Sequence, residues 1–220
     1  MTHPILDVFE RINVRAPFTR PRALEIFCGP GTGQTMQYAP MCEYLEGWDV
    51  DEQRIAEFKK NIPKAKAKIC DVYKQVPDYS GKAFNVIAVD NFLLKAPFEH
   101  FDLFPGIFNL MDPRVCFVIL TVCPDPFGYA EPRKDTLQKA FGSKVGEFMV
   151  DWDAARDRFY SLPPLDPNCL PKPRPISAVG LGAMEDIYRE KFEAGDFQVP
   201  YTFSRMRSKS VGYVLIEAHR

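Results

Sequence analysis

Short runs with strand character recur along the first half of the chain, most of them strongly apolar and the third one alternating. They are RALEIF (residues 22–27), EYLEGWDV (43–50), KAKAKICDV (64–72), AFNVIAVDNF (83–92) and RVCFVILTV (114–122). Several of these runs are apolar at successive positions, instead of alternating with polar residues. Continuous apolar strands are typical of a parallel sheet that is covered on both faces.

Segments with helical character separate these runs. Residues 51–62 begin with acidic residues, end with lysines and carry Ile55, Phe58 and Ile62 on one helical face, as the helix dipole and the helical period favour. Residues 33–45 predict a short helix that breaks or ends near Pro40. Residues 98–111 are apolar and predict a helix with Pro105 at an end or a kink.

The end of the chain has a different pattern. Residues 183–196 predict a charged amphipathic helix, and residues 198–206 and 210–218 predict an antiparallel strand pair joined by a short turn. Strands alternating with helices and closed by such a pair indicate an α/β protein with a doubly wound, mostly parallel sheet. We expect helices on both of its faces.

The length of the chain favours a single domain, residues 1–220. Within it, residues 123–180 break the strand–helix pattern because they are rich in proline, with a helical stretch in the middle. This segment is either a surface insertion without a role or a wall of a substrate pocket, since it leaves the carboxyl end of a strand. We expect it to cover the substrate.

Charge and cysteine content limit the binding partners and the cellular compartment that we expect. The 28 Lys and Arg residues against 29 Asp and Glu residues give a net charge of −1, so no global positive field indicates nucleic acid or membrane. The 6 cysteines are scattered without metal-ligand spacing and predict buried free thiols in a reducing compartment. We see neither a signal peptide nor a membrane span, and expect a cytoplasmic protein.

The sequence EIFCGPGTG (residues 25–33) follows the first strand and contains Gly29, Gly31 and Gly33. Glycines between a strand and a helix let backbone amides approach a ligand closely. The spacing is not the G-x-G-x-x-G of dinucleotide-binding proteins, which argues against a dehydrogenase. The alternative is a tight structural turn without a ligand.

Two aspartates follow the next two strands. Asp49 ends the second strand, where a carboxylate can accept hydrogen bonds from both hydroxyls of a ribose, and Asp71 ends the third, where it can accept from an adenine amino group. Each by itself also fits a helix cap or a solvated loop. Together with the glycine turn they stand in the order that a nucleoside pocket needs.

These motifs resemble the class I S-adenosylmethionine-dependent methyltransferases. The resemblance rests on Glu25 with CGPGTG, on Asp49 in GWDVD, on Asp71 in ICDV and on VIAVDNF. It implies a seven-stranded sheet with a reversed last strand, and S-adenosylmethionine as cofactor. It also places Gly29 and Gly31 under the methionine end, Asp49 at the ribose and Asp71 at the adenine. The full cofactor set it implies is Glu25, Phe27, Gly29, Gly31, Gly33, Asp49, Val50, Asp71 and Val72.

The resemblance also suggests catalytic residues and a substrate. Asp90, Asn91 and Phe92 stand where amino-methylating enzymes carry (D/N/S)-P-P-(Y/F), and we expect them to accept a proton and stack on a planar substrate. Phe27 gives the variant E-x-F-x-G-x-G, which is similar to nucleic-acid base methyltransferases. The leading hypothesis is therefore methylation of a nucleic-acid base. A small-molecule N- or O-methyltransferase and a non-catalytic cofactor-binding subunit are the alternatives.

Other reactive or charged residues receive weaker interpretations. Cys123 follows the fifth strand, where a thiolate nucleophile would stand, although a buried thiol is the simpler reading. The three histidines are isolated and predict no metal site. A set of basic residues forms either a basic rim or a solvated face, and we expect the latter: Lys172, Arg174, Arg205, Arg207 and Lys209.

Overall fold

The computed structural model describes residues 3–75, 81, 83–90, 98–122, 178–208 and 211–220. Its strands are β1 (Arg22–Ile26), β2 (Tyr44–Asp49), β3 (Lys66–Ile69), β4 (Val86–Val89), β5 (Cys116–Val122), β6 (Gln198–Met206) and β7 (Gly212–His219). Its helices are α1 (Pro4–Arg15), α2 (Gln34–Tyr38), α3 (Glu52–Asn61), α4 (Val72–Gln75), α5 (Phe98–Leu110) and α8 (Ala178–Glu193), with a 3-10 turn η1 (Ala39–Met41).

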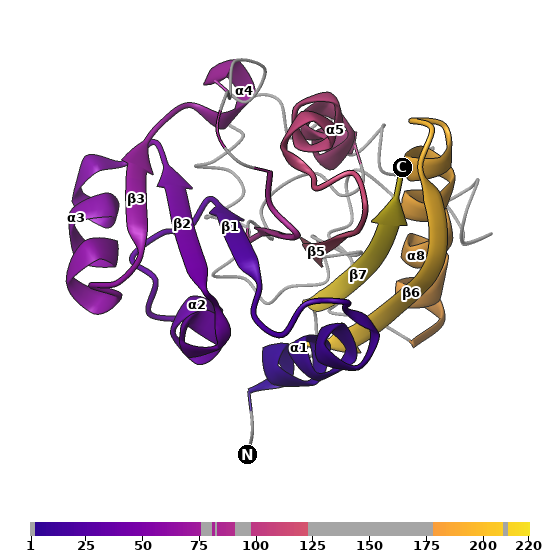
Figure 1. The fold of residues 1–220 in the computed structure, drawn as a ribbon, viewed down its shortest axis with the longest axis horizontal. Helices are drawn as coiled ribbons and strands as arrows, with labels where there is room; N and C mark the ends of the chain where they lie inside the picture. Colours follow the sequence, from indigo (N-terminus) through magenta and orange to yellow (C-terminus); the bar gives the residue numbers. More distant parts are fainter. Residues whose placement is uncertain (1–2, 76–80, 82, 91–97, 123–177, 209–210) are drawn as a thin grey trace, which may run out of the picture.

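The strands form one seven-stranded sheet in the order β3-β2-β1-β4-β5-β7-β6, which crosses the molecule from β3 at one side to β6 at the other (Figure 1). Strands β1 to β5 are parallel, and β7 is antiparallel to both of its neighbours. The predicted doubly wound sheet with a reversed last strand is confirmed. The chain changes direction across the sheet between β1 and β4, which is where α/β proteins bind ligands.

Helices cover both faces of the sheet, and the strand β5 shows how the sequence arranges this. Cys116, Val118 and Leu120 point to one core, whereas Phe117 and Ile119 point to the other. Every residue of β5 is buried, as the continuous apolar run predicted. Helices α5 and α8 pack on the first face, and α1, α2 and α3 contribute to the core on the second.

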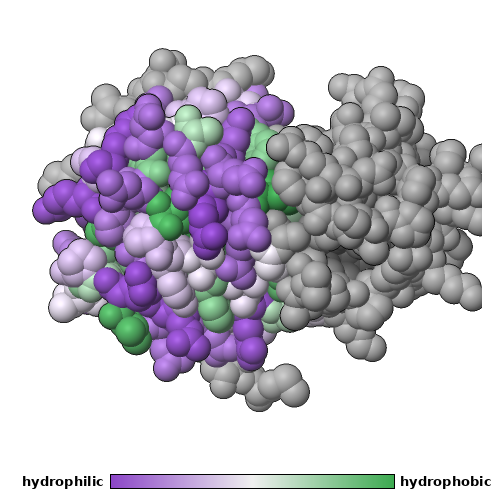
Figure 2. All heavy atoms as spheres, turned by 90° about the vertical axis from the view of Figure 1, so that its right-hand side faces the viewer, coloured by the Kyte–Doolittle hydropathy of each residue, from purple (hydrophilic) through white to green (hydrophobic). Residues whose placement is uncertain are grey.

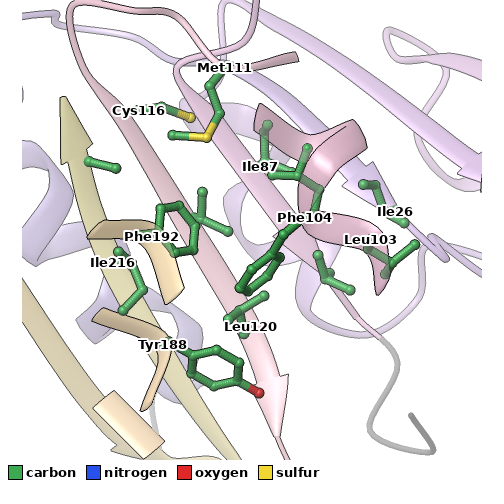
Figure 3. Close-up of a cluster of buried hydrophobic side chains, with 14 of the residues drawn as sticks. Ile26, Ile87, Leu103, Phe104, Met111, Cys116, Leu120, Tyr188, Phe192 and Ile216 are labelled. Carbon is green, nitrogen blue, oxygen red and sulfur yellow. The ribbon is translucent and has the colours of Figure 1, made fainter. Parts of the chain in front are cut away.

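Aromatic side chains fill the space between α5 and α8. Phe104 and Phe192 pack edge to face with their ring centroids 5.0 Å apart, and Tyr188 lies beside Phe104 at 6.0 Å. Figure 3 shows these rings around Leu120 of β5, with Ile216 of β7 nearby. Such pairs contribute about 0.5–1.5 kcal/mol each beyond their burial, so this cluster fixes the two helices on the sheet.

Two helices differ from the sequence-based expectations. Helix α1 was not predicted, although His3 caps its start and Ile5, Phe9 and Ile12 recur at helical spacing on its buried face. Pro105 lies inside α5, so of the two predicted places, an end or a kink, the end is excluded and the kink stays a prediction. A proline lacks the amide that donates to the residue four positions earlier. Leu103, Phe104 and Ile107 around it are buried in the core.

The edges of the sheet are protected in different ways. Strand β3 is mostly exposed and carries Lys66 and Lys68, and lysines on an edge strand oppose pairing with other chains. On the face seen in Figure 2, which is the β6 side, the described surface is mostly hydrophilic with scattered apolar residues.

No helix in the described ranges is both long and apolar enough to cross a bilayer.

The segment that was expected to cover the substrate lies largely outside the described residues, which stop at Val122 and resume at Ala178. Residues 178–180, the last three of the range 123–180, form the first turn of α8. The bounds of the segment, like its role, stay a prediction.

Candidate functional site

The glycine turn after β1 has an unusual backbone. Phe27, Gly29 and Gly31 all have positive φ, at 61°, 53° and 71°. A Cβ on Gly31 would lie 2.8 Å from the ring of Phe58, whereas a Cβ on Gly29 would meet nothing within 4 Å. Gly31 is therefore required by packing, and Gly29 borders open space at the carboxyl edge of the sheet.

Phe27 stands out because it is not a glycine. A left-handed backbone costs a residue with a side chain roughly 1–2 kcal/mol, and such strain concentrates at functional sites. The Phe27 ring is partly buried against the core and lies 6.2 Å from the ring of Tyr73. The chain thus accepts backbone strain to keep an aromatic ring at this turn.

The carboxylate of Asp49 braces the same turn from the end of β2. One oxygen accepts a hydrogen bond from the Gly29 amide at 3.0 Å, and the other accepts from the Asp51 amide at 3.0 Å. Asp49 is only 4% exposed. Each carboxylate oxygen has a second lone pair, so a bound ligand and this bracing role are compatible.

Glu25 is fully buried directly before the turn. It accepts hydrogen bonds from the Gln34 amide at 3.1 Å and from the Tyr38 hydroxyl at 2.7 Å, which ties β1 to α2. Burial raises the pKa of Glu25 to about 7, and the nearby charge of Asp90 adds to this rise. With no exposed surface, Glu25 supports the turn from behind.

Exposed apolar side chains gather at the ends of β2 and β3. Val50 is 69% exposed, Ile69 50% and Tyr73 46%. All three follow or end neighbouring strands at the carboxyl edge of the sheet, and their contact with an adenine stays a prediction. Asp71 accepts from the Tyr73 amide at 3.2 Å. Val72 is buried in the core, and its contact with a cofactor stays a prediction.

Asp90 follows β4 and takes part in a network that its sequence position did not reveal. Its Oδ1 accepts from the Thr121 hydroxyl at 3.0 Å and from the Arg207 guanidinium at 2.9 Å. Its amide donates to the Ile26 carbonyl at 3.1 Å, which fixes it next to the glycine turn. Asn91 and Phe92, predicted with it, lie outside the described residues.

Arg207 and Tyr213 complete this network and were not predicted as site residues. The Arg207 guanidinium lies over the Tyr213 ring at 5.7 Å, and the buried Tyr213 hydroxyl has no hydrogen-bond partner in the described structure. Arg207 had been assigned to a solvated face, but its side chain is only 25% exposed. In the sequence, Arg207 could be placed only in the predicted turn between the last two strands, which does not identify its partner.

The cysteines and histidines do not form a reactive centre in the described structure. Cys28, Cys42, Cys70 and Cys116 are buried free thiols, as predicted. Burial raises the pKa of each of them, so they are poor nucleophiles. No cluster of potential metal ligands occurs among the residues described. Cys123 lies outside them.

The residues present fit S-adenosylmethionine. Gly29 leaves open space where the amino-acid end is expected, because a side chain there would project into it. The Asp49 carboxylate binds the Gly29 amide beside this space. The exposed apolar residues Val50, Ile69 and Tyr73 lie at or after the ends of β2 and β3. An adenosine needs a hydrogen-bond acceptor for its ribose hydroxyls and an apolar surface for its purine ring. The Asp49 carboxylate and these apolar residues are groups of those kinds.

Comparisons with known proteins agree with this reading at the level of the fold. No protein-family model and no curated protein matches the sequence. Among solved structures, magnesium protoporphyrin IX methyltransferase from Synechocystis PCC 6803 with bound SAH superposes with a TM-score of 0.56 at 14% identity, over 98% of this chain and 81% of that one.

Two further structures are similar. The N-methyltransferase NodS from Bradyrhizobium japonicum WM9 gives a TM-score of 0.51 at 11% identity, over 97% of this chain and 94% of that one. A fibrillarin/Nop5p complex gives 0.50 at 11% identity, over 92% and 74%. The resemblance read from the motifs is thus confirmed in three dimensions: the chain has the fold of the class I S-adenosylmethionine-dependent methyltransferases.

Proposed function

We propose that this protein is an S-adenosylmethionine-dependent methyltransferase. The observation that carries the proposal is the juxtaposition of an open, left-handed glycine turn with the ion-paired carboxylate of Asp90. The turn is braced by Asp49 at the end of β2, and both features meet at the carboxyl edge where the sheet changes direction. Structures with this fold have been solved with SAM and SAH bound.

The cofactor would lie along this edge. Gly29, Gly31 and Gly33 would border its methionine end, with Asp49 at the ribose. Val50, Asp71 and Tyr73 would surround the adenine, with Phe27 closing the pocket from the turn. Glu25 holds the turn through Gln34 and Tyr38 and needs no contact with the cofactor.

S-Adenosylmethionine supplies an electrophilic methyl group when bound, and much of the rate then depends on how the acceptor atom is oriented. Thr121 and Arg207 fix the direction of the Asp90 carboxylate. A carboxylate held in this way can accept a hydrogen bond, and then the proton, from an amine or hydroxyl acceptor. Asn91 and Phe92 would complete the acceptor site.

For the acceptor we propose a nucleic-acid base. Phe27 supports this choice, because the motif E-x-F-x-G-x-G that it creates is similar to that of nucleic-acid base methyltransferases. The chain keeps this aromatic ring even though the backbone of Phe27 is left-handed. The test is methyl transfer from labelled cofactor to RNA, DNA and small-molecule pools. Transfer to nucleic acid, with binding that weakens steeply as salt rises, supports the proposal. Transfer to small molecules alone contradicts the acceptor class but not the methyltransferase activity.

A small-molecule acceptor is the second candidate, and the net charge of −1 favours it. The neighbours leave this open, since one acts on magnesium protoporphyrin IX and another is an N-methyltransferase. A non-catalytic cofactor-binding subunit is the third, because the catalytic motif lacks both prolines. Cofactor binding without transfer to any pool would identify it.

Asp90→Asn separates catalysis from cofactor binding. We expect its affinity for SAH, measured by calorimetry, to stay near that of the wild type. Turnover should fall about 100-fold or more, since an amide cannot take the proton. If affinity and rate fall together, Asp90 belongs to the cofactor wall. If neither changes, its catalytic role is wrong.

A further inference from the structure

The Asp90–Arg207 pair joins two elements that are far apart in the sequence. Arg207 lies 117 residues after Asp90 and follows β6, whereas Asp90 follows β4. The Arg207 amide donates to the Val211 carbonyl at 2.8 Å, so the hairpin between β6 and β7 holds the base of this side chain. The guanidinium therefore has a defined position over the carboxyl edge of the sheet.

The other end of the guanidinium points to the glycine turn. Nη1 binds Asp90, while Nη2 lies 3.8 Å from the position that a Cβ on Gly33 would occupy. One side chain thus reaches both the end of β4 and the end of the glycine turn. A guanidinium carries five N–H donors in a planar fork, so it can bind a second carboxylate while it keeps the first.

The surroundings favour a further anion here. The Tyr213 hydroxyl is buried beside Arg207 and has no hydrogen-bond partner among the described residues. His3 is close enough to Arg207 and Asp90 for their charges to act on it, but burial and Arg207 lower its pKa, so it adds no positive charge near neutral pH. Among the described residues, Arg207 supplies the positive charge beside Asp90.

We propose that Arg207 binds the carboxylate at the methionine end of the cofactor through Nη2 while its Nη1 stays on Asp90. This inference rests on the proposed function. It makes Arg207 the residue that distinguishes a ligand with an amino-acid end from a bare adenosine thioether. The same guanidinium also fixes the orientation of Asp90 through Nη1.

The test compares two ligands by calorimetry. SAH carries the amino-acid end, and 5′-methylthioadenosine has the same nucleoside and sulfur without it. In Arg207→Met we expect the affinity for SAH to fall about 10- to 100-fold, the range of a lost charged hydrogen bond. The affinity for 5′-methylthioadenosine should stay unchanged. Arg207→Lys keeps the positive charge without the planar guanidinium. Its affinity for SAH should lie between those of the wild type and Arg207→Met.

Arg205→Met is the matched control, because Arg205 is exposed and pairs with Asp7 instead; both affinities should match the wild type. If Arg207→Met does not fold, the double variant Asp90→Asn/Arg207→Met removes both charges and takes its place. Unchanged SAH affinity, or an equal loss for both ligands, overturns the inference alone. A folded wild type that binds neither ligand overturns the proposed function itself.

Discussion

Two carboxylates of this site, Asp49 and Glu25, hold the backbone in place in addition to the roles that the sequence predicted for them. Asp49 was expected to contact a ribose, yet it also accepts hydrogen bonds from the Gly29 and Asp51 amides while almost fully buried. Glu25 holds α2 from complete burial. At both residues a buried carboxyl group accepts hydrogen bonds from fixed donors, as buried polar groups require.

Asp49→Ala should therefore impair both binding and folding. Losing the ribose contact is expected to weaken SAH binding by about 1.5–3 kcal/mol. Leaving the partly buried Gly29 and Asp51 amides without this acceptor should lower the free energy of unfolding by about 1 kcal/mol. Calorimetry and urea denaturation measure the two effects. Asp49→Asn, which keeps one acceptor oxygen, should recover part of the stability. Full SAH affinity in folded Asp49→Ala would refute the ribose assignment.

Glu25 should make stability depend on pH. Burial raises its pKa from 4.5 to about 7, so the folded state binds a proton more tightly than the unfolded state. The stability that this proton contributes is fully present below pH 4.5 and is lost as pH rises through about 7.

Glu25→Gln removes this titration, so its free energy of unfolding should rise relative to the wild type between about pH 5 and about pH 8. Gln34, whose side-chain oxygen lacks a partner, can turn to accept from the new amide. Urea denaturation at both pH values measures the difference. The exposed Glu10→Gln should show no such trend, and a constant difference for Glu25→Gln would contradict the argument.

At the scale of the element, the turn between β1 and α2 is held by its neighbours on both sides. The Cys28 amide donates to the Trp48 carbonyl of β2, and Asn61 at the end of α3 donates to the Pro30 carbonyl at 2.9 Å. Phe58 of α3 closes the space behind Gly31. The glycines of this turn therefore serve different purposes.

Gly29→Ala and Gly31→Ala test this difference. Both add a Cβ to a left-handed residue, which costs about 1–2 kcal/mol. Gly31→Ala should lose about 1–3 kcal/mol more, because its Cβ collides with Phe58. Gly29→Ala should keep most of its stability but bind SAH about tenfold less tightly, since its Cβ enters the proposed pocket. Thermal denaturation and calorimetry distinguish them; equal effects would contradict the two roles.

At the scale of the whole molecule, the sheet brings four strand ends together at one edge. The glycine turn after β1, Asp49 at the end of β2, Asp90 after β4 and Thr121 near the end of β5 meet there. The hairpin of β6 and β7 adds Arg207. A parallel doubly wound sheet does this by construction, because its strands all end at the same edge. The segment after β5 leaves from this edge too.

Replacing residues 123–177 with a Gly/Ser linker tests the role of that segment. We expect the shortened protein to bind SAH but to lose methyl transfer, because connections this long in a compact domain are usually functional. Calorimetry and a labelled-methyl assay measure the two properties. Normal transfer by the shortened protein would make the segment a bystander. Failure to fold would place it in the core.

The sequence by itself determined the elements and the order of the motifs. Continuous apolar runs predicted the buried strands β1, β4 and β5, and the dipole-ordered charges of residues 51–62 predicted α3. These signals are local, since burial on both faces leaves apolar residues at successive positions. The glycines, Asp49 and Asp71 could be placed at strand ends for the same reason.

Only the tertiary structure decided what these residues contact. Nothing local in the sequence relates Arg207 to Asp90, which lies 117 residues earlier; their pairing follows from the antiparallel return of β7 beside β5, which sets the hairpin over the site. The bracing of Gly29 by Asp49 likewise depends on the register of β1 against β2. Side-chain partners across a sheet are set by strand order, which a local pattern does not encode.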